Sequence, residues 1–215
     1  AKISGAGTST ITIEGVNKLS SGIVENIPDR IEAGTYIIIG ALCGKNLQIT
    51  GVIKEHLESL FSKLQEMGVS LEFNNKGVII NSKDNYNPVN IKTLVYPGFP
   101  TDLGQPISVL LTKCNGTSII DETIYENRKG HVPYLVKMGA SITIDNQKFF
   151  IVGPSSLHGE EVISSDLRAG AALIEAGLIA DGETKIGEID HILRGYENII
   201  EKLSKVNADI KIIEE

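Results

Sequence analysis

The chain has 215 residues, of which 41% are apolar and 22% charged, and its net charge at neutral pH is −7. This composition is typical of a globular protein, and the negative charge disfavours nucleic acid as a partner, because nucleic-acid binding requires a basic face. No apolar run approaches the roughly 20 residues of a membrane span, and the first residues do not have the pattern of a signal peptide. We therefore expect a cytoplasmic protein with neither a nucleic-acid nor a membrane partner.

The two cysteines, Cys43 and Cys114, both lie in apolar segments that resemble helices. A buried, unreactive thiol is the favoured interpretation of each. This interpretation agrees with a reducing compartment, and the two residues do not form a cysteine pair with the spacing of a zinc site.

Three stretches of the chain share one order of predicted elements. Each begins at an aspartate (Asp29, Asp102 or Asp166) that precedes an apolar helical run, and a glycine follows 14 to 16 residues later, before a strand. A second helical run and an alternating strand complete each stretch, and in the last stretch that strand is "ADIKII". We expect each aspartate to be the N-cap of its first helix. The repeats are predicted at roughly 15–82, 89–153 and 160–213.

The first helices of the repeats are apolar on almost every face, most clearly over residues 169–180. A helix of that kind must be buried on all sides. The strands "TITIEG" (10–15), "GVIINS" (77–82) and "KFFIVG" (148–153) have the alternating or β-branched pattern of sheets with one covered face. The sequence therefore predicts an α/β fold with helices inside and sheets outside, in a pseudo-threefold arrangement. Since no linker separates the repeats, we expect a single domain.

Only four of the 20 basic residues are arginines, namely Arg30, Arg128, Arg168 and Arg194. The repeat pattern places all four at predicted helix N-termini on one edge of the fold. Helix N-termini already favour anions, so added arginines there indicate a site for one or more anions. Ordinary structural ion pairing is the alternative explanation of each arginine.

Asp102 differs from the other two leading aspartates in its surroundings, because "YPGFPTDLGQP" is a rigid loop rich in proline and glycine. Such a loop can fix a carboxylate well enough for it to act as a general base. A turn followed by a simple helix cap explains the same residues equally well. His131 and His191 lie near the same edge without metal-ligand spacing, so no metal site is expected.

Five motifs in this order, "IPDRIEAGT", "YPGFPTD", "TIYENR", "SDLRAGAAL" and "RGYE", resemble the second half of the UDP-N-acetylglucosamine 1-carboxyvinyltransferase family. The resemblance covers essentially the whole chain. It implies an inverted α/β barrel of three repeats that faces a second, similar domain across a cleft. It also implies transfer of enolpyruvyl from phosphoenolpyruvate to the sugar 3-hydroxyl in peptidoglycan synthesis, with release of phosphate and without a metal or organic cofactor.

The resemblance also implies roles for individual residues. Asp102 would be the base at the sugar 3-hydroxyl and part of the substrate site, and Asp166 would be a second catalytic carboxylate near the reacting carbons. Arg168 and Arg194 would bind phosphoenolpyruvate, with Arg128 lining the same cleft. These roles suit the residues chemically, because forked guanidinium donors match a phosphate and a carboxylate.

For the sugar nucleotide, the resemblance implies contacts with Ile124 and Tyr125. Two positions depart from the family pattern, since Lys129 replaces the usual aromatic residue after "ENR" and Leu193 replaces the usual aspartate before "RGYE". Both departures bear on the local geometry of the neighbouring arginines.

The family's other half carries a Lys-Asn pair and a mobile loop with a cysteine, and this chain matches neither feature. We therefore expect this chain to be the C-terminal half of such an enzyme, inactive by itself, with the N-terminal domain as a partner. Two other functions stay open. The chain could be a non-catalytic repeat domain that binds an anion or a partner protein, or it could belong to a shikimate-type enolpyruvyl transferase.

Overall fold

A computed structural model of the chain describes residues 1–213. Its helices are α1 (Arg30–Cys43), α2 (Glu58–Met67), α3 (Gly104–Leu111), α4 (Val132–Lys137), α5 (Leu167–Ile179), α6 (Asp190–Leu193) and α7 (Ile199–Ser204), with short 3₁₀ helices η1 (Lys54–His56) and η2 (Thr101–Leu103). Its strands are β1 (Lys2–Ser4), β2 (Thr12–Glu14), β3 (Leu47–Thr50), β4 (Ser70–Asn74), β5 (Gly77–Asn81), β6 (Asn90–Lys92), β7 (Gly116–Asp121), β8 (Ser141–Asp145), β9 (Lys148–Gly153), β10 (Glu161–Ile163) and β11 (Lys185–Gly187).

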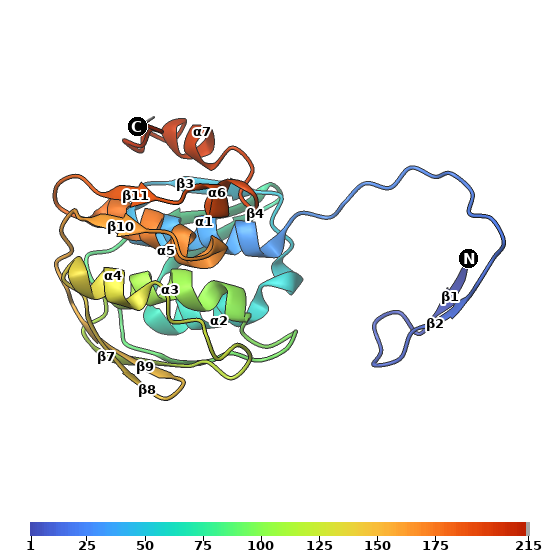
Figure 1. The fold of residues 1–215 in the computed structure, drawn as a ribbon, viewed down its shortest axis with the longest axis horizontal. Coiled ribbons are helices and arrows are strands. Elements are labelled where there is room, and N and C mark those ends of the chain that lie inside the picture. The colour runs from blue at the N-terminus through green and yellow to red at the C-terminus, as the bar shows by residue number, and fades with distance from the viewer. Residues whose placement is uncertain (214–215) are drawn as a thin grey trace.

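Three helices, α1, α3 and α5, lie in the middle of the fold and contact one another in every pairing (Figure 1). Each also contacts a different sheet, since α1 packs on β3 and β5, α3 on β7 and β9, and α5 on β11. The predicted burial of α5 is confirmed over residues 169–176, which are all buried. A helix can be buried on every face only where other elements surround it, and here two helices and a sheet do so.

The sheets differ in size but share one pattern of pairing. One sheet has the order β3-β5-β4 with antiparallel pairs, and the same order recurs as β7-β9-β8 in a second sheet. In that second sheet β6 adds a parallel strand to β7, and β10 pairs with β11 in parallel in the same way. The predicted strands 77–82 and 148–153 are confirmed as β5 and β9.

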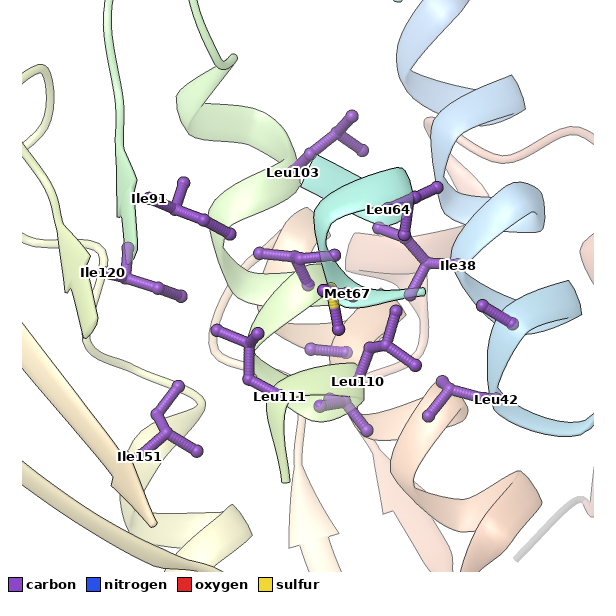
Figure 2. Packing of buried hydrophobic residues seen from close by; sticks show 14 of the residues in the cluster. Ile38, Leu42, Leu64, Met67, Ile91, Leu103, Leu110, Leu111, Ile120 and Ile151 are labelled. Atoms are coloured by element: carbon purple, nitrogen blue, oxygen red, sulfur yellow. The ribbon is translucent and has the colours of Figure 1, made fainter. Parts of the chain in front are cut away.

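The apolar core lies between these helices and sheets (Figure 2). Ile38 of α1, Leu64 of α2 and Leu110 of α3 point toward one another, and all three are fully buried. Ile120 and Ile151 extend the core from α3 to the four-stranded sheet. Full burial of a side chain of this size contributes roughly 1.5–3 kcal/mol, so this cluster is the main term that holds helices and sheets together.

Gly170 has to be a glycine because there is no room for a side chain at its position. A Cβ at Gly170 in α5 would lie 2.3 Å from Cγ1 of Ile192 and 2.4 Å from Oγ of Ser164. Any side chain there would therefore push α6 away from the start of α5. This close approach fixes where Arg194, just beyond α6, lies relative to Arg168.

Two sequence predictions about local structure are wrong. Residues 208–213 form no strand, although Ala208 and Ile210 do pack against the smaller apolar cluster. The alternating pattern is thus real, but no neighbouring strand pairs with the segment. Cys43, expected to be buried, is exposed at the last turn of α1, whereas Cys114 is buried as predicted.

The first 29 residues are all exposed and extend away from the helices as an arm that carries the β1–β2 hairpin (Figure 1). β2 confirms the strand predicted at 10–15, with Ile3 of β1 paired to Ile13 of β2. Its predicted covered face is not seen, because both isoleucines are exposed. In the described part of the chain, no helix is long and apolar enough to cross a membrane.

Glu175 is the least expected residue of the core. It lies in the middle of α5 with an exposed fraction of 0%, and neither carboxylate oxygen has a hydrogen-bond partner within the described residues. Burial raises the pKa of this carboxyl well above its ordinary value, because desolvation penalises the charged form. Burial therefore favours the protonated form of Glu175 in the folded chain, and the residue costs stability where the unfolded chain would ionise it.

This cost has a definite pH dependence. Below about pH 4.5, the ordinary value, both the folded and the unfolded chain hold the proton and the penalty vanishes. As the pH rises, the unfolded chain releases the proton and the folded chain keeps it, so stability falls. We expect Glu175→Leu to raise the thermal unfolding midpoint at pH 7, by roughly 2–4 °C for each kcal/mol recovered.

The same substitution should change the midpoint much less at pH 4.5. Thermal unfolding followed by circular dichroism from pH 4.5 to 8 measures this difference. Glu183→Gln is the control, because Glu183 is exposed and should leave the curve unchanged. An equal effect of Glu175→Leu at every pH would contradict the explanation.

Candidate functional site

The start of α5 is fixed by Asp166. Its Oδ1 accepts hydrogen bonds from the backbone N–H groups of Arg168 (2.9 Å) and Ala169 (3.0 Å), which confirms the predicted N-cap. Asp29 caps α1 in the same way, through the N–H of Ile31 at 2.7 Å. The other oxygen of Asp166, Oδ2, accepts only a long hydrogen bond of 3.5 Å from Gln105 and another from Ser165. One oxygen therefore holds the helix, and the other is available to a ligand.

Asp102 is not an N-cap, so that part of the prediction is wrong. The chain enters a 3₁₀ turn at Thr101, which places Asp102 inside η2, and neither η2 nor α3 has a side-chain cap. The carboxylate instead binds two guanidinium groups. Its Oδ1 accepts from Nη2 of Arg128, and its Oδ2 lies 3.4 Å from Nη2 of Arg168.

These residues line one pocket of about 320 Å³. The lining residues share a position at the starts of α3 and α5 or in the loops before α4 and after α6, and they are Asp102, Tyr125, Asn127, Arg128, Asp166, Leu167, Arg168 and Arg194. Three guanidinium groups face two carboxylates there, which leaves a net positive charge. A concave site with an excess of one sign of charge attracts ligands of the opposite sign.

Two of the arginines are held in place by aromatic rings. The guanidinium of Arg168 lies 5.4 Å from the ring centre of Tyr196, and that of Arg128 lies 5.3 Å from the ring centre of Tyr125. The hydroxyl of Tyr196 is in turn 2.9 Å from that of Thr35 in α1. Rings placed in this way orient a planar guanidinium without occupying its donors.

Several donors of these arginines have no partner within the described residues. Nε of Arg128 and Nη1 of Arg168 are buried and form no hydrogen bond. Arg194 forms no ion pair with any residue in the described range. Buried donors are normally satisfied, so these open N–H groups point to a ligand that accepts hydrogen bonds.

The prediction that all four arginines lie at helix N-termini on one edge of the fold is partly wrong. Arg194 is the C-cap of α6 and lies before α7, which begins at Ile199, so it is not at a helix start. Arg30 is outside the pocket, with its guanidinium 5.4 Å from the ring centre of Tyr96. Ile124 is 43% exposed and does not line the pocket, although its neighbour Tyr125 does.

His131 lies behind the pocket and is 2% exposed. The hydroxyl of Ser108 donates to the backbone carbonyl of Gln105 at 2.6 Å, so its oxygen accepts from Nε2 of His131 at 3.0 Å. Nδ1 is then a bare acceptor. Burial lowers the pKa of His131 to about 4, with a further lowering from Arg128 and an opposing effect of Asp166. The ring is therefore neutral at pH 7.

No group of three or more histidine, cysteine, aspartate or glutamate side chains suited to a metal occurs among residues 1–213.

The two departures from the family pattern also have a visible structural setting. Lys129 donates from Nζ to the backbone carbonyl of Asn146 at 2.7 Å, in the turn between β8 and β9. Leu193 is 40% exposed at the end of α6, next to Arg194.

Sequence reasoning missed Asn127 and Leu167, which line the pocket, Tyr196, whose ring lies against Arg168, and the buried Glu122. Glu122 is a buried carboxylate directly after β7, where it accepts hydrogen bonds from two threonine side chains and two backbone N–H groups. Its sequence position, at the end of a β-branched strand, is too common to signal such a role.

The family EPSP synthase (3-phosphoshikimate 1-carboxyvinyltransferase) matches residues 1–203. UDP-N-acetylglucosamine 1-carboxyvinyltransferase 2 of Streptococcus thermophilus is 51% identical over 100% of this chain and 51% of its own length. UDP-N-acetylglucosamine 1-carboxyvinyltransferase of Halothermothrix orenii is 52% identical over 98% of this chain and 51% of its own. The chain therefore spans about half the length of the curated relatives it matches.

A solved structure shares the fold. The crystal structure of the enolpyruvyl transferase NikO from Streptomyces tendae covers 86% of this chain and 44% of its own, with 30% sequence identity and a TM-score of 0.79. The mixed arrangement of helices and sheets described above is thus that of an enolpyruvyl transferase.

The geometry predicts that Asp102 competes with external anions. Asp102→Asn removes the charge that holds Arg128 and Arg168, so we expect this chain to bind inorganic phosphate about threefold to tenfold more tightly. Isothermal titration at low salt measures the change. Asp145→Asn, at the exposed end of β8, is the control for total charge. Weaker phosphate binding by Asp102→Asn would contradict the competition.

Proposed function

Because the chain belongs to the EPSP synthase family, and its relatives named UDP-N-acetylglucosamine 1-carboxyvinyltransferase are about half identical to it, we propose that it is the C-terminal half of such a transferase. The complete protein moves enolpyruvyl from phosphoenolpyruvate to the 3-hydroxyl of UDP-N-acetylglucosamine and releases phosphate. Identity at this level over the whole chain favours the sugar nucleotide over shikimate 3-phosphate as acceptor.

One observation carries this proposal. The pocket holds Arg128, Arg168 and Arg194 together with Asp102, and two of the arginines keep buried donors without partners. Phosphoenolpyruvate bears both a phosphate and a carboxylate, and forked guanidinium donors bind each of these groups through paired hydrogen bonds. A single small anion would leave part of this donor set unused.

The reaction then proceeds in two steps. A proton is added to the methylene carbon of phosphoenolpyruvate, which makes C2 cationic, and the carboxylate of Asp166 stabilises that charge. The sugar 3-hydroxyl attacks C2 while Asp102 accepts its proton. The new methyl group then returns a proton to the donor that supplied it, which expels phosphate and restores the double bond. The hydroxyl proton on Asp102 leaves with the phosphate, so protons and charges balance without a metal or organic cofactor.

The ion pairs of Asp102 fit this sequence of events. In the chain alone, both carboxylate oxygens of Asp102 are occupied by guanidinium donors. Phosphoenolpyruvate binding supplies anionic oxygens to Arg128 and Arg168 in its place, and Asp102 is released to face the sugar hydroxyl. Asp102 is therefore free to accept the hydroxyl proton only when phosphoenolpyruvate is bound.

The remaining finer points belong to the same proposal. The chain forms one domain, an inverted barrel of three repeats at roughly 15–82, 89–153 and 160–213, and it works in the cytoplasm against an N-terminal domain. That domain supplies the Lys-Asn pair and the loop cysteine that the family resemblance implies. Ile124, exposed beside the pocket, contacts the sugar nucleotide together with Tyr125.

Mixing this chain with its N-terminal half, in the presence of both substrates, tests the proposal through phosphate release. We expect release by the mixture and none above the buffer rate by the chain alone, because the missing half supplies essential groups. Turnover by the chain alone would overturn the assignment as a half-enzyme. Phosphate binding without turnover by a folded mixture would favour a non-catalytic anion-binding domain.

In the complete enzyme, Asp102→Asn should lower kcat by about 10²-fold or more, because an amide cannot accept the hydroxyl proton. Stability should change little, since Asp102 caps no helix. Arg168→Lys should also lower kcat/KM for phosphoenolpyruvate, because an ammonium cannot replace a planar fork. Lys205→Arg is the control, because Lys205 forms an exposed ion pair with Glu201 in α7 and does not line the pocket. Wild-type kinetics in both site variants would refute these roles.

A further inference from the structure

Glu122 is 3% exposed and has four hydrogen-bond donors on one carboxylate. Oε1 accepts from the hydroxyl of Thr93 (2.8 Å) and from the backbone N–H groups of Ile124 (2.9 Å) and Tyr125 (3.0 Å). Oε2 accepts from the hydroxyl of Thr101 at 2.8 Å. Its own N–H donates to the carbonyl of Gln147 at 3.0 Å, which anchors the backbone at this residue to the turn between β8 and β9.

The donors come from both sides of the Asp102–Arg128 ion pair. Thr101 directly precedes Asp102 in η2. On the other side, Tyr125 is three residues before Arg128, accepts a backbone hydrogen bond from it at 3.3 Å, and lies with its ring against the guanidinium. One buried carboxylate therefore connects the segment that carries Asp102 to the segment that carries Arg128.

The charge of Glu122 serves no ion pair within the described residues, since every partner is a neutral hydroxyl or N–H donor. Hydrogen bonds to a charged acceptor are about twice as strong as those between neutral groups. A carboxylate also accepts more bonds at once than any other side chain. This chemistry suits a residue that fixes the relative position of two loops.

We propose that Glu122 is a positioning residue of the transferase, which sets the place of Asp102 through Thr101 and the place of Arg128 and the sugar-nucleotide contacts through the N–H groups of residues 124 and 125. The proposal rests on the function proposed above. Reacting groups displaced by about 1 Å can lose as much as 10²-fold in rate, so a tether at this point controls the chemistry without touching a substrate.

Glu122 makes two connections, one through Thr101 to Asp102 and one through the N–H groups of residues 124 and 125 to Arg128. These connections can be tested separately. Thr101→Val removes only the hydrogen bond that connects Glu122 to the Asp102 segment. We expect kcat of the assembled enzyme to fall about tenfold, while KM for the sugar nucleotide changes by less than about twofold. Glu122→Ala removes both connections, so it should lower kcat and also raise that KM. Glu122→Gln should recover most of the activity, because its amide oxygen still accepts from both N–H groups and its NH₂ group can donate to Thr101.

Thr112→Val is the matched control. Thr112 is a fully buried threonine at the C-terminal end of α3, and its hydroxyl binds only the carbonyl of Val109 at 2.7 Å. Thermal unfolding of every variant ensures that kinetics are measured on folded protein. Wild-type kcat and KM in Thr101→Val and Glu122→Ala, with wild-type enzyme active, would overturn the inference and leave the proposed function standing.

Failure of the wild-type assembly to release phosphate would instead count against the proposed function. The phosphate affinity of this chain alone still tests the tether in that case, because Arg128 is one of its anion ligands. We expect Glu122→Ala to weaken that affinity about threefold or more and Glu122→Gln to restore it. An unchanged affinity in Glu122→Ala would overturn the inference.

Discussion

The carboxylate of Asp102 binds two guanidinium groups at once, and the pocket depends on that arrangement. Three arginines around one small cavity, two of them half-buried, would repel one another in the absence of a counter-charge. Asp102 neutralises Arg128 and Arg168, while Arg194 has no ion-pair partner among the described residues. The site thus contains an anion of its own, contributed by the chain. An incoming ligand displaces that anion only if it brings more negative oxygen than one carboxylate provides, which is a selection by charge before any selection by shape.

The helices that carry these groups are placed by packing rather than by the charges themselves. α5 is surrounded by α1, α3 and β11, so its first turn cannot move independently. The cap from Asp166 then sets the direction of the chain at Arg168. The same burial explains the raised pKa of Glu175, because a helix enclosed on all sides offers its middle residues no water. Apart from Glu175, the residues of the apolar interior supply most of the stabilising free energy. The charged groups of the site lie at the solvent-facing ends of the helices.

Much of this could be read from the sequence. The apolar run at 169–180 required a buried helix, and Asp166 before it required a cap, and both features depend on neighbours in the chain. The placement of Arg128, Arg168 and Arg194 on one edge of the fold followed from their positions in the repeats, even though the local reason was wrong for Arg194, which ends α6. Asp102 was misplaced as a cap because nothing in "FPTDLG" distinguishes a 3₁₀ turn from a direct helix start.

Other features could not be predicted because they depend on distant partners. The alternation at 208–213 holds for Ala208 and Ile210, which pack inward, whereas Ile212 and Ile213 are exposed. A strand also needs a neighbour to pair with, and pairing is decided elsewhere in the chain. The side-chain donors to Glu122 lie 21 and 29 residues away, and its other two donors are backbone N–H groups that carry no residue identity. A cluster of that kind becomes visible only in three dimensions.

The arm formed by the first 29 residues has a practical consequence for the chain in solution. Its two-stranded hairpin leaves both outer strand edges without partners, and Ile3, Ile11 and Ile13 are all more than half exposed. Hairpins of this size are marginally stable in water, and free apolar strand edges pair readily with other chains. At the concentrations used for crystallisation or NMR, the purified chain should therefore form reversible oligomers through this arm, and a version shortened to begin near Asp29 should stay monomeric.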